Sequence, residues 1–261
     1  MTKVLAIIVS FLVIMLFLSI ESGYAFGENI VAAWLMDEGS GKFVTDYMAN
    51  YDDAPIEGKA EWVDGKFGGA LEFDGSGSHV QVPFSAAAHV LNQSDFTFAM
   101  WFKAEALPDD RSAWIAGFQQ MDNNGTGRTW MGLQDGTNLV YSALGNIRPL
   151  GTAPEVGVWS HFALVITEDG ANNNLQLYSD GVMITEMALS VEDCEGDYLI
   201  GCHKNLNALN SWEGAIDEVV MLNKALEPDE LNQLINDGVS TILAVEGRHK
   251  LATTWGNLKS Y

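Results

Sequence analysis

Short strand-like runs dominate this chain from residue 26 onward. Each run is apolar or alternates apolar with polar residues, and clusters of Gly, Asn and Asp separate one run from the next. Successive runs with no helix between them predict antiparallel strands instead of a parallel sheet, so the expected fold class is all-β, an antiparallel two-sheet sandwich. The runs cover residues 29–36, 69–75, 79–84, 96–105, 112–120, 139–145, 159–168, 175–181, 182–189, 198–204 and 215–222.

One short helix is predicted near the C-terminus, in the stretch EPDELNQLINDG. Pro228 stands in its first turn with acidic residues beside it, and Gly238 ends it. An apolar stripe of Leu231, Leu234 and Ile235 would bury one face. The segment after this helix, residues 239–261, is too short and polar for a domain, and its role is left open.

The first 25 residues have the pattern of an export signal. Lys3 precedes a long apolar run, and small residues follow it up to Ala25, where cleavage is expected. We therefore divide the chain into a signal peptide (1–25), one domain (26–238) and a C-terminal tail (239–261), and expect a secreted or extracytoplasmic protein without stable membrane insertion after cleavage. The alternative is a retained anchor, because the apolar run from Val4 to Ile20 is near the lower limit for spanning a bilayer.

The net charge limits the partners. The chain has 13 basic and 35 acidic residues, a formal charge of -22, and this surface repels phosphate backbones and anionic lipids. Nucleic acid is therefore excluded as a partner. The same carboxylates offer oxygen ligands for hard cations such as calcium.

The two cysteines, Cys194 and Cys202, lie on either side of a predicted turn, EGD. In an oxidising compartment, this spacing across a hairpin predicts a disulfide. The alternatives are two buried thiols or half of a metal site, although zinc sites use closer pairs.

Five fragments in order resemble the LamG-like jellyroll family, part of the concanavalin A-like lectin/glucanase group. They span roughly residues 28–238 and read WLMDEGSGKFVTDY, GKFGGALEFDGSGSHVQVP, DFTFAMWFKAE, VWSHFALVITEDGANNNLQLYSDGVMI and EGAIDEVVMLNKALEPDELNQL. The resemblance implies a jelly-roll sandwich, often with a structural calcium, that binds glycans or proteins outside the cell. The same sandwich also carries glycosidases, so the fold alone does not decide the function.

The acidic stretch WEGAIDEVVMLNK lacks the arrangement that a retaining glycosidase of this fold needs. Such an enzyme has acids alternating along one strand, so that two carboxyl groups face each other across the scissile bond. Here Asp217 and Glu218 are adjacent and project to opposite faces unless a bulge intervenes, and Ala215 stands where the central acid belongs. We expect no catalytic residues, and therefore no enzyme.

Calcium is the better hypothesis for these acids. In a jelly roll the first and last strands lie near one another, so Asp37 and Asp217 would converge as in the family's structural calcium site, with Asp74 as a further contributor. The alternative is that the carboxylates cap turns or form ion pairs. Asp74 and Asp180 each precede a Gly, which is typical of tight turns.

Candidate ligand-binding residues are chosen by type and by position in loops. Aromatic rings stack on sugars, and Asn, Asp or Gln side chains form hydrogen bonds with the hydroxyl groups. The set is Trp114, Asn123, Asn124, Arg128, Trp130, Asp135 and Tyr141. The stretch from Asp122 to Leu133 is expected to be a flexible turn.

The predicted function is therefore a secreted, non-enzymatic binding module that recognises a glycan or an extracellular protein and carries a structural calcium. The alternatives are a glycoside hydrolase or other carbohydrate-active enzyme of the same fold, and a matrix protein without a small ligand.

Overall fold

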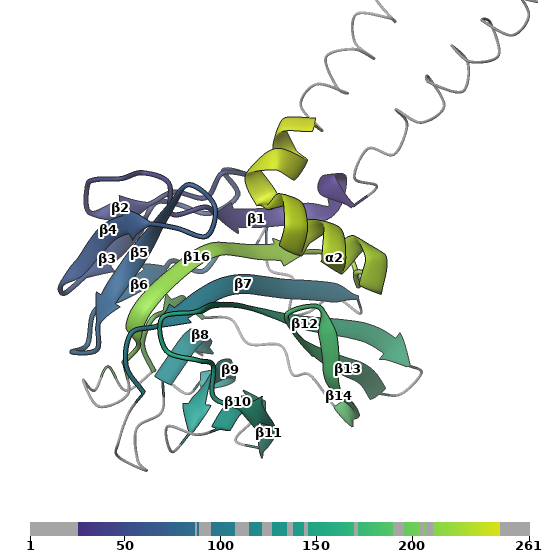
Figure 1. Cartoon of the computed structure of the whole chain (residues 1–261). Helices are drawn as coiled ribbons and strands as arrows, with labels where there is room; N and C mark the ends of the chain where they lie inside the picture. Colours follow the sequence, from purple (N-terminus) through teal and green to yellow (C-terminus); the bar gives the residue numbers. More distant parts are fainter. Residues whose placement is uncertain are drawn as a thin grey trace, which may run out of the picture.

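The computed structural model describes residues 26–86, 88, 95–107, 115–121, 127–134, 138–143, 146–169, 172–189, 196–203, 206 and 211–245. The predicted signal peptide therefore lies outside the described residues, as does the tail from residue 246. The described residues form two antiparallel sheets of eight strands each (Figure 1). This confirms the predicted all-β sandwich with one short C-terminal helix.

The first sheet has the order β14-β13-β12-β7-β16-β5-β4, and β1 also pairs with β16. Its strands are β1 (Ile30–Trp34), β4 (Ala60–Asp64), β5 (Gly69–Asp74), β7 (Phe96–Ala104), β12 (Trp159–Asp169), β13 (Asn172–Ser179), β14 (Val182–Leu189) and β16 (Glu213–Leu222). Strand β16 is central: one edge pairs with β7, and the other pairs first with β5 and then with β1.

The second sheet has the order β11-β10-β9-β8-β15-β6-β3-β2. Its strands are β2 (Phe43–Val44), β3 (Ala54–Glu57), β6 (His79–Val82), β8 (Ile115–Met121), β9 (Gly127–Gln134), β10 (Asn138–Ala143), β11 (Asn146–Thr152) and β15 (Tyr198–Ile200). Strand β9 corrects the prediction of a flexible turn, because residues 127–134 pair with both β8 and β10.

The core between the sheets follows the alternation read from the sequence. In β7, Phe96, Phe98, Met100 and Phe102 all join the inter-sheet core. Ala99 lies in a second apolar cluster on the outer face of the first sheet. The strand is therefore buried on both sides over most of its length, and Lys103 is the outward residue that is partly exposed.

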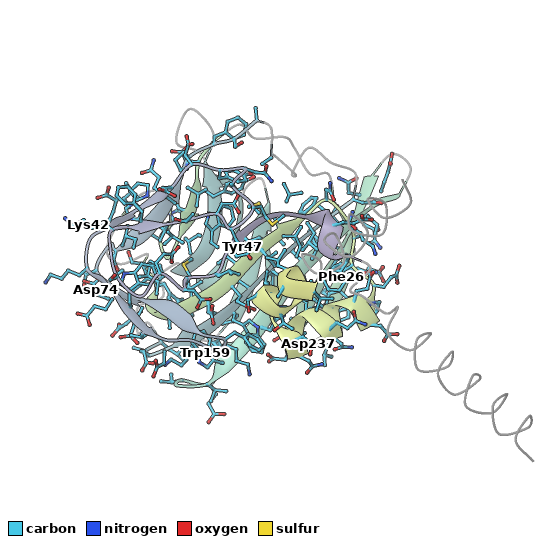
Figure 2. All side chains as sticks on the ribbon, turned by 90° about the horizontal axis from the view of Figure 1, so that it is seen from above. Phe26, Lys42, Tyr47, Asp74, Trp159 and Asp237 are labelled. Atoms are coloured by element: carbon cyan, nitrogen blue, oxygen red, sulfur yellow. The ribbon has the colours of Figure 1, made fainter. Side chains whose placement is uncertain are left out.

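Helix α2 (Pro228–Asp237) covers that outer face (Figure 2). Glu227 and Glu230 form a capping box at its start, and Gly238 ends it with φ 75°, as the sequence predicts. Leu231 and Leu234 pack into the outer cluster, and each buried leucine contributes about 1.5–3 kcal/mol of transfer free energy.

Residues 239–245, the beginning of the predicted tail, are helical and pack into the same outer cluster. Val239, Ile242 and Leu243 are buried there together with Phe26 and Ile30, so the two ends of the described chain share one apolar layer. Within the described residues, no helix has the length and apolarity needed to cross a membrane.

Candidate functional site

A β-bulge interrupts β16 at the acidic pair. Asp217 pairs with Trp101 of β7, but the next pair is Val220 with Ala99, so β16 carries one extra residue. Glu218 has φ 46°, in the left-handed region that non-glycine residues rarely adopt. At this bulge β16 stops pairing with β5 and begins to pair with β1. The bulge therefore changes the direction of the Asp217 and Glu218 side chains where β1, β5 and β16 meet.

Asp217 is fully buried beneath the turn between β4 and β5. Its Oδ2 accepts a hydrogen bond of 3.0 Å from the amide of Phe67, while Oδ1 has no hydrogen-bond partner among the described residues. Burial raises the pKa of Asp217 to about 8, and the neighbouring charge of Glu218 acts in the same direction. A lone buried carboxylate oxygen is costly unless a cation, a proton or a water satisfies it.

Glu218 is buried beneath a different segment, the start of the helical residues 239–245. Its Oε1 and Oε2 accept hydrogen bonds of 2.9 and 3.0 Å from the amide of Val239. Burial raises the pKa of Glu218 to about 7, with a smaller contribution in the same direction from the charge of Asp37. Glu218 therefore ties the C-terminal helical segment to the central strand.

Asp37 reaches the same turn from the end of β1. Its Oδ1 accepts a hydrogen bond of 2.6 Å from the amide of Gly69. A Cβ at Gly68, which has φ 62°, would lie 2.3 Å from that oxygen, so only glycine fits this position. The structure thus brings Asp37 and Asp217 together on one turn, residues 65–69, which we call the 65–69 turn.

Asp74 lies elsewhere. It pairs with Glu213 at the opposite end of β5 and β16, and its Oδ1 accepts hydrogen bonds from the amide of Ser76 at 2.9 Å and the hydroxyl of Ser78 at 2.7 Å. Asp74 is therefore a turn-forming residue in this structure. No three His, Cys, Asp or Glu side chains within the described ranges form a group that could hold a metal ion, so calcium at the 65–69 turn would depend on backbone carbonyls and water for its remaining ligands.

A buried polar row extends from Asp217 across the first sheet. Trp101 pairs with Asp217 on one side and with His161 of β12 on the other. The centres of the Trp101 and His161 rings are 5.1 Å apart. Trp101 Nε1 and His161 Nδ1 also lack hydrogen-bond partners among the described residues. Buried polar atoms of this kind are usually satisfied by ordered water or a ligand.

Lys66 covers this row. Its Nζ lies 4.3 Å from the centre of the Trp101 ring, a cation–π contact. Burial lowers the pKa of His161 to about 3, and the charge of Lys66 adds to that effect. His161 is therefore neutral at physiological pH and is not a proton donor there.

The predicted ligand-binding set is only partly described. Trp114, Asn123, Asn124 and Asp135 lie outside the described residues. Arg128 and Trp130 belong to β9 and Tyr141 to β10, where Trp130 pairs with Ser142 and Tyr141 with Met131. The structure thus brings these three residues onto adjacent strands near one end of the second sheet.

The predicted disulfide is not seen. Cys202 is a free, buried thiol that donates to the carbonyl of His203 at 3.1 Å, and Cys194 lies outside the described residues.

Sequence reasoning missed Asp46, which is 1% exposed. Its carboxylate accepts hydrogen bonds of 2.8–3.1 Å from the amides of Ala33, Met48, Asn50 and Tyr51. The available signal was the alternation in FVTDY, where Val44 and Asp46 share one side of an extended segment.

Comparison with known families identifies one match. The model of the concanavalin A-like lectin/glucanases superfamily matches residues 74–232, more than half of the chain. No curated protein sequence matches the chain.

Solved structures share the fold at low identity. Domain 4 of an extracellular GH43 arabinanase from Geobacillus stearothermophilus, in complex with arabinotriose, is 17% identical with a TM-score of 0.60, over 80% of this chain and 98% of that one. The binding domain of Paraclostridial Mosquitocidal Protein 1 is 18% identical with a TM-score of 0.61, over 80% of this chain and 52% of that one.

The sialidase of Trypanosoma rangeli in complex with sialic acid is 17% identical with a TM-score of 0.65, over 81% of this chain and 34% of that one. The chain thus spans about half of the mosquitocidal binding domain and a third of the sialidase.

Proposed function

Because the chain belongs to the concanavalin A-like lectin/glucanase superfamily, we propose that it is an exported, non-enzymatic module that binds a glycan. The observation that carries this proposal is the burial of both acids of the bulge. Asp217 is 0% and Glu218 3% exposed, and each accepts a hydrogen bond from the backbone of a covering segment. Carboxylates held in this way stabilise the fold and do not reach a glycosidic bond.

The structural neighbours supply the first ligands to test. Arabinotriose is bound by domain 4 of the arabinanase, and sialic acid by the sialidase. The fold that the chain shares with them extends over nearly all of the arabinanase domain but only a third of the sialidase chain, so the arabinanase domain is the better guide to a first ligand. An extracellular protein is the second ligand class, supported by the binding domain of the mosquitocidal toxin.

The test is isothermal titration of the exported protein with arabinotriose and with sialic acid, alongside an array of other glycans. We expect binding to at least one glycan with no release of reducing sugar. Absence of binding to every glycan would overturn the proposal, as would the appearance of hydrolysis products.

Calcium is proposed as a structural ligand at the 65–69 turn, held by Asp37 and Asp217. The unsatisfied Oδ1 of Asp217 fits a cation, because a bound calcium ion would complete its coordination and remove the cost of burying the carboxylate. Calcium would act there by joining β1 to β16 and would take no part in ligand chemistry.

Thermal unfolding in EDTA and after calcium is restored tests this site. An ion that binds only the folded state at a hundred times its Kd adds about 2.7 kcal/mol to the free energy of unfolding. We expect the melting temperature to rise with calcium in the wild type and to stay unchanged in Asp37→Ala and Asp217→Ala. A calcium response in both variants equal to that of the wild type would exclude this site.

A further inference from the structure

Residues 43–47 form an exposed ridge of alternating side chains, separate from the buried acids of β16. Val44 and Asp46 point inward, with 0% and 1% of their surfaces exposed. Phe43 and Tyr47 point outward and are 53% and 60% exposed. Strand β2 covers Phe43 and Val44, and Tyr47 begins the turn that follows, so the ridge carries one exposed aromatic ring at each of its ends.

The ridge is held rigidly on the sandwich. The carboxylate of Asp46 accepts hydrogen bonds from four backbone amides. One is that of Ala33 in β1, and the others are those of Met48, Asn50 and Tyr51, which follow Asp46 in the chain. The amide of Tyr47 donates to the carbonyl of Ala33 in β1 at 2.8 Å. Figure 2 labels Lys42, the residue before the ridge, and Tyr47, the last residue of the ridge. A backbone fixed in this way loses little conformational entropy when a ligand binds.

Polar groups lie between the two rings. The amide of Thr45 donates to Glu38 Oε1 at 2.8 Å, and its hydroxyl donates to Asp53 Oδ1 at 3.0 Å. All three side chains are exposed. The carboxylates keep further acceptor capacity for hydroxyl groups of a ligand, because each carboxylate accepts about four hydrogen bonds.

We propose that this ridge binds a neutral, extended oligosaccharide, with Phe43 and Tyr47 stacking on two sugar rings and Glu38 and Asp53 accepting hydrogen bonds from hydroxyls between them. The inference rests on the proposed glycan-binding function and gives it a site and a ligand class. Two exposed aromatic rings with polar groups between them match the alternating apolar faces and hydroxyl edges of a sugar chain.

The charge around the ridge selects a neutral ligand. Glu38, Asp52 and Asp53 are exposed within or beside it, and Lys42 is the one basic residue in the stretch from 38 to 53. The net charge of the whole chain is -22. A glycan that carries sialic or uronic acid would be repelled by these carboxylates.

The experiment titrates the exported protein with neutral arabino- and gluco-oligosaccharides of increasing length, starting from the single sugar, and with sialic acid. We expect affinity to rise with length until one ligand reaches both rings, and no binding of sialic acid. Phe43→Ala and Tyr47→Ala each remove one stacking contact and should weaken binding of the longer ligands roughly tenfold. Tyr47→Phe keeps the ring and should retain most of the affinity.

Val182→Ala is the matched control, because Val182 is 69% exposed on β14 and outside the ridge. Unchanged melting temperatures establish that the ridge variants are folded. If the wild type binds a neutral glycan and both alanine variants bind it equally well, this site is wrong while the proposed function stands. If sialic acid is the ligand, the assignment of a neutral glycan is overturned. If the wild type binds no glycan at all, the proposed function itself fails.

Discussion

The carboxylates of Asp37 and Asp217 hold one turn from two sides, through the amides of Gly69 and Phe67. Asp37 follows β1 and Asp217 lies in β16, so the 65–69 turn is fixed to two neighbouring strands from opposite ends of the described chain. Glu218 extends this connection to the helical residues 239–245. Asp37, Asp217 and Glu218 therefore join four segments of the fold: the end of β1, the 65–69 turn, β16 and residues 239–245.

The first prediction concerns the pH dependence of the calcium-free protein. The pKa of Asp217 is raised to about 8 and that of Glu218 to about 7, both above their unfolded values. A carboxyl group whose pKa is raised by folding stabilises the folded state fully at pH values below its pKa in the unfolded chain. This stabilisation is lost as the pH rises through the pKa of the group in the folded protein. In EDTA, the free energy of unfolding should therefore fall between about pH 4 and pH 8 through these two groups.

Urea unfolding across this pH range measures the effect. Asp217→Asn should reduce the slope, because its side chain does not titrate. Calcium should also reduce the slope, because a bound cation favours the ionised carboxylate. A slope that is the same in wild type and Asp217→Asn would contradict the assignment.

His161 should give the opposite dependence in acid. Burial lowers its pKa to about 3, so the unfolded chain takes up a proton near pH 6.5 while the folded protein does not. His161 therefore contributes to the free energy of unfolding at pH values above its pKa in the unfolded chain, and this contribution is lost as the pH falls from about 6.5 toward 3. His161→Phe should abolish this part of the acid sensitivity, and a proton NMR titration of His161 should find no protonation at pH 5. Protonation of His161 near pH 6.5 in the folded protein would refute the prediction.

Glu218→Ala should release the helical segment 239–245 from β16. The amides of Val239 and Ser240 lose their acceptors, and the loss of charge-assisted hydrogen bonds costs about 2–3 kcal/mol. Hydrogen exchange should become faster at Val239 and Ile242 and remain slow in β7. Glu213→Ala, at the exposed end of the same strand, serves as the control and should leave these rates unchanged.

Asp46→Ala should be among the most destabilising substitutions in the chain. Four backbone amides would lose their acceptor at a buried site, and a cost of at least about 3 kcal/mol follows from the penalty for unsatisfied buried donors. Chemical unfolding measures the change. Asp53→Ala, an exposed acid nearby, should change stability by less than about 0.5 kcal/mol.

Strong periodicity made part of the fold predictable. The strand-like run at residues 96–105 located β7, and Pro228 and Gly238 marked the two ends of α2 correctly. Strand β4 was missed because Trp62 and Val63 are adjacent apolar residues, so AEWVD does not alternate. Strand β2 was missed because it has only two residues.

The bulge at Glu218 has no sequence signal. Its φ of 46° occurs at a glutamate, where local preference argues against the left-handed region, so tertiary contacts with Val239 and the switch of β16 from β5 to β1 must determine it. Asp46 was missed for a different reason: the alternation in FVTDY places it on the same side as Val44, but aspartate is mostly an exposed residue type and was read as one. The convergence of Asp37 and Asp217, by contrast, was expected from the resemblance to a jelly roll.

The most direct test of the account measures binding and hydrolysis together. Wild type and a variant with both Asp217→Asn and Glu218→Gln are incubated with the glycan that binds best, and complex formation and reducing sugar are followed in the same sample. We predict equal binding by the two proteins and no reducing sugar from either. Release of sugar by the wild type, abolished in the folded variant, would contradict the claim that these acids are structural in a binding module.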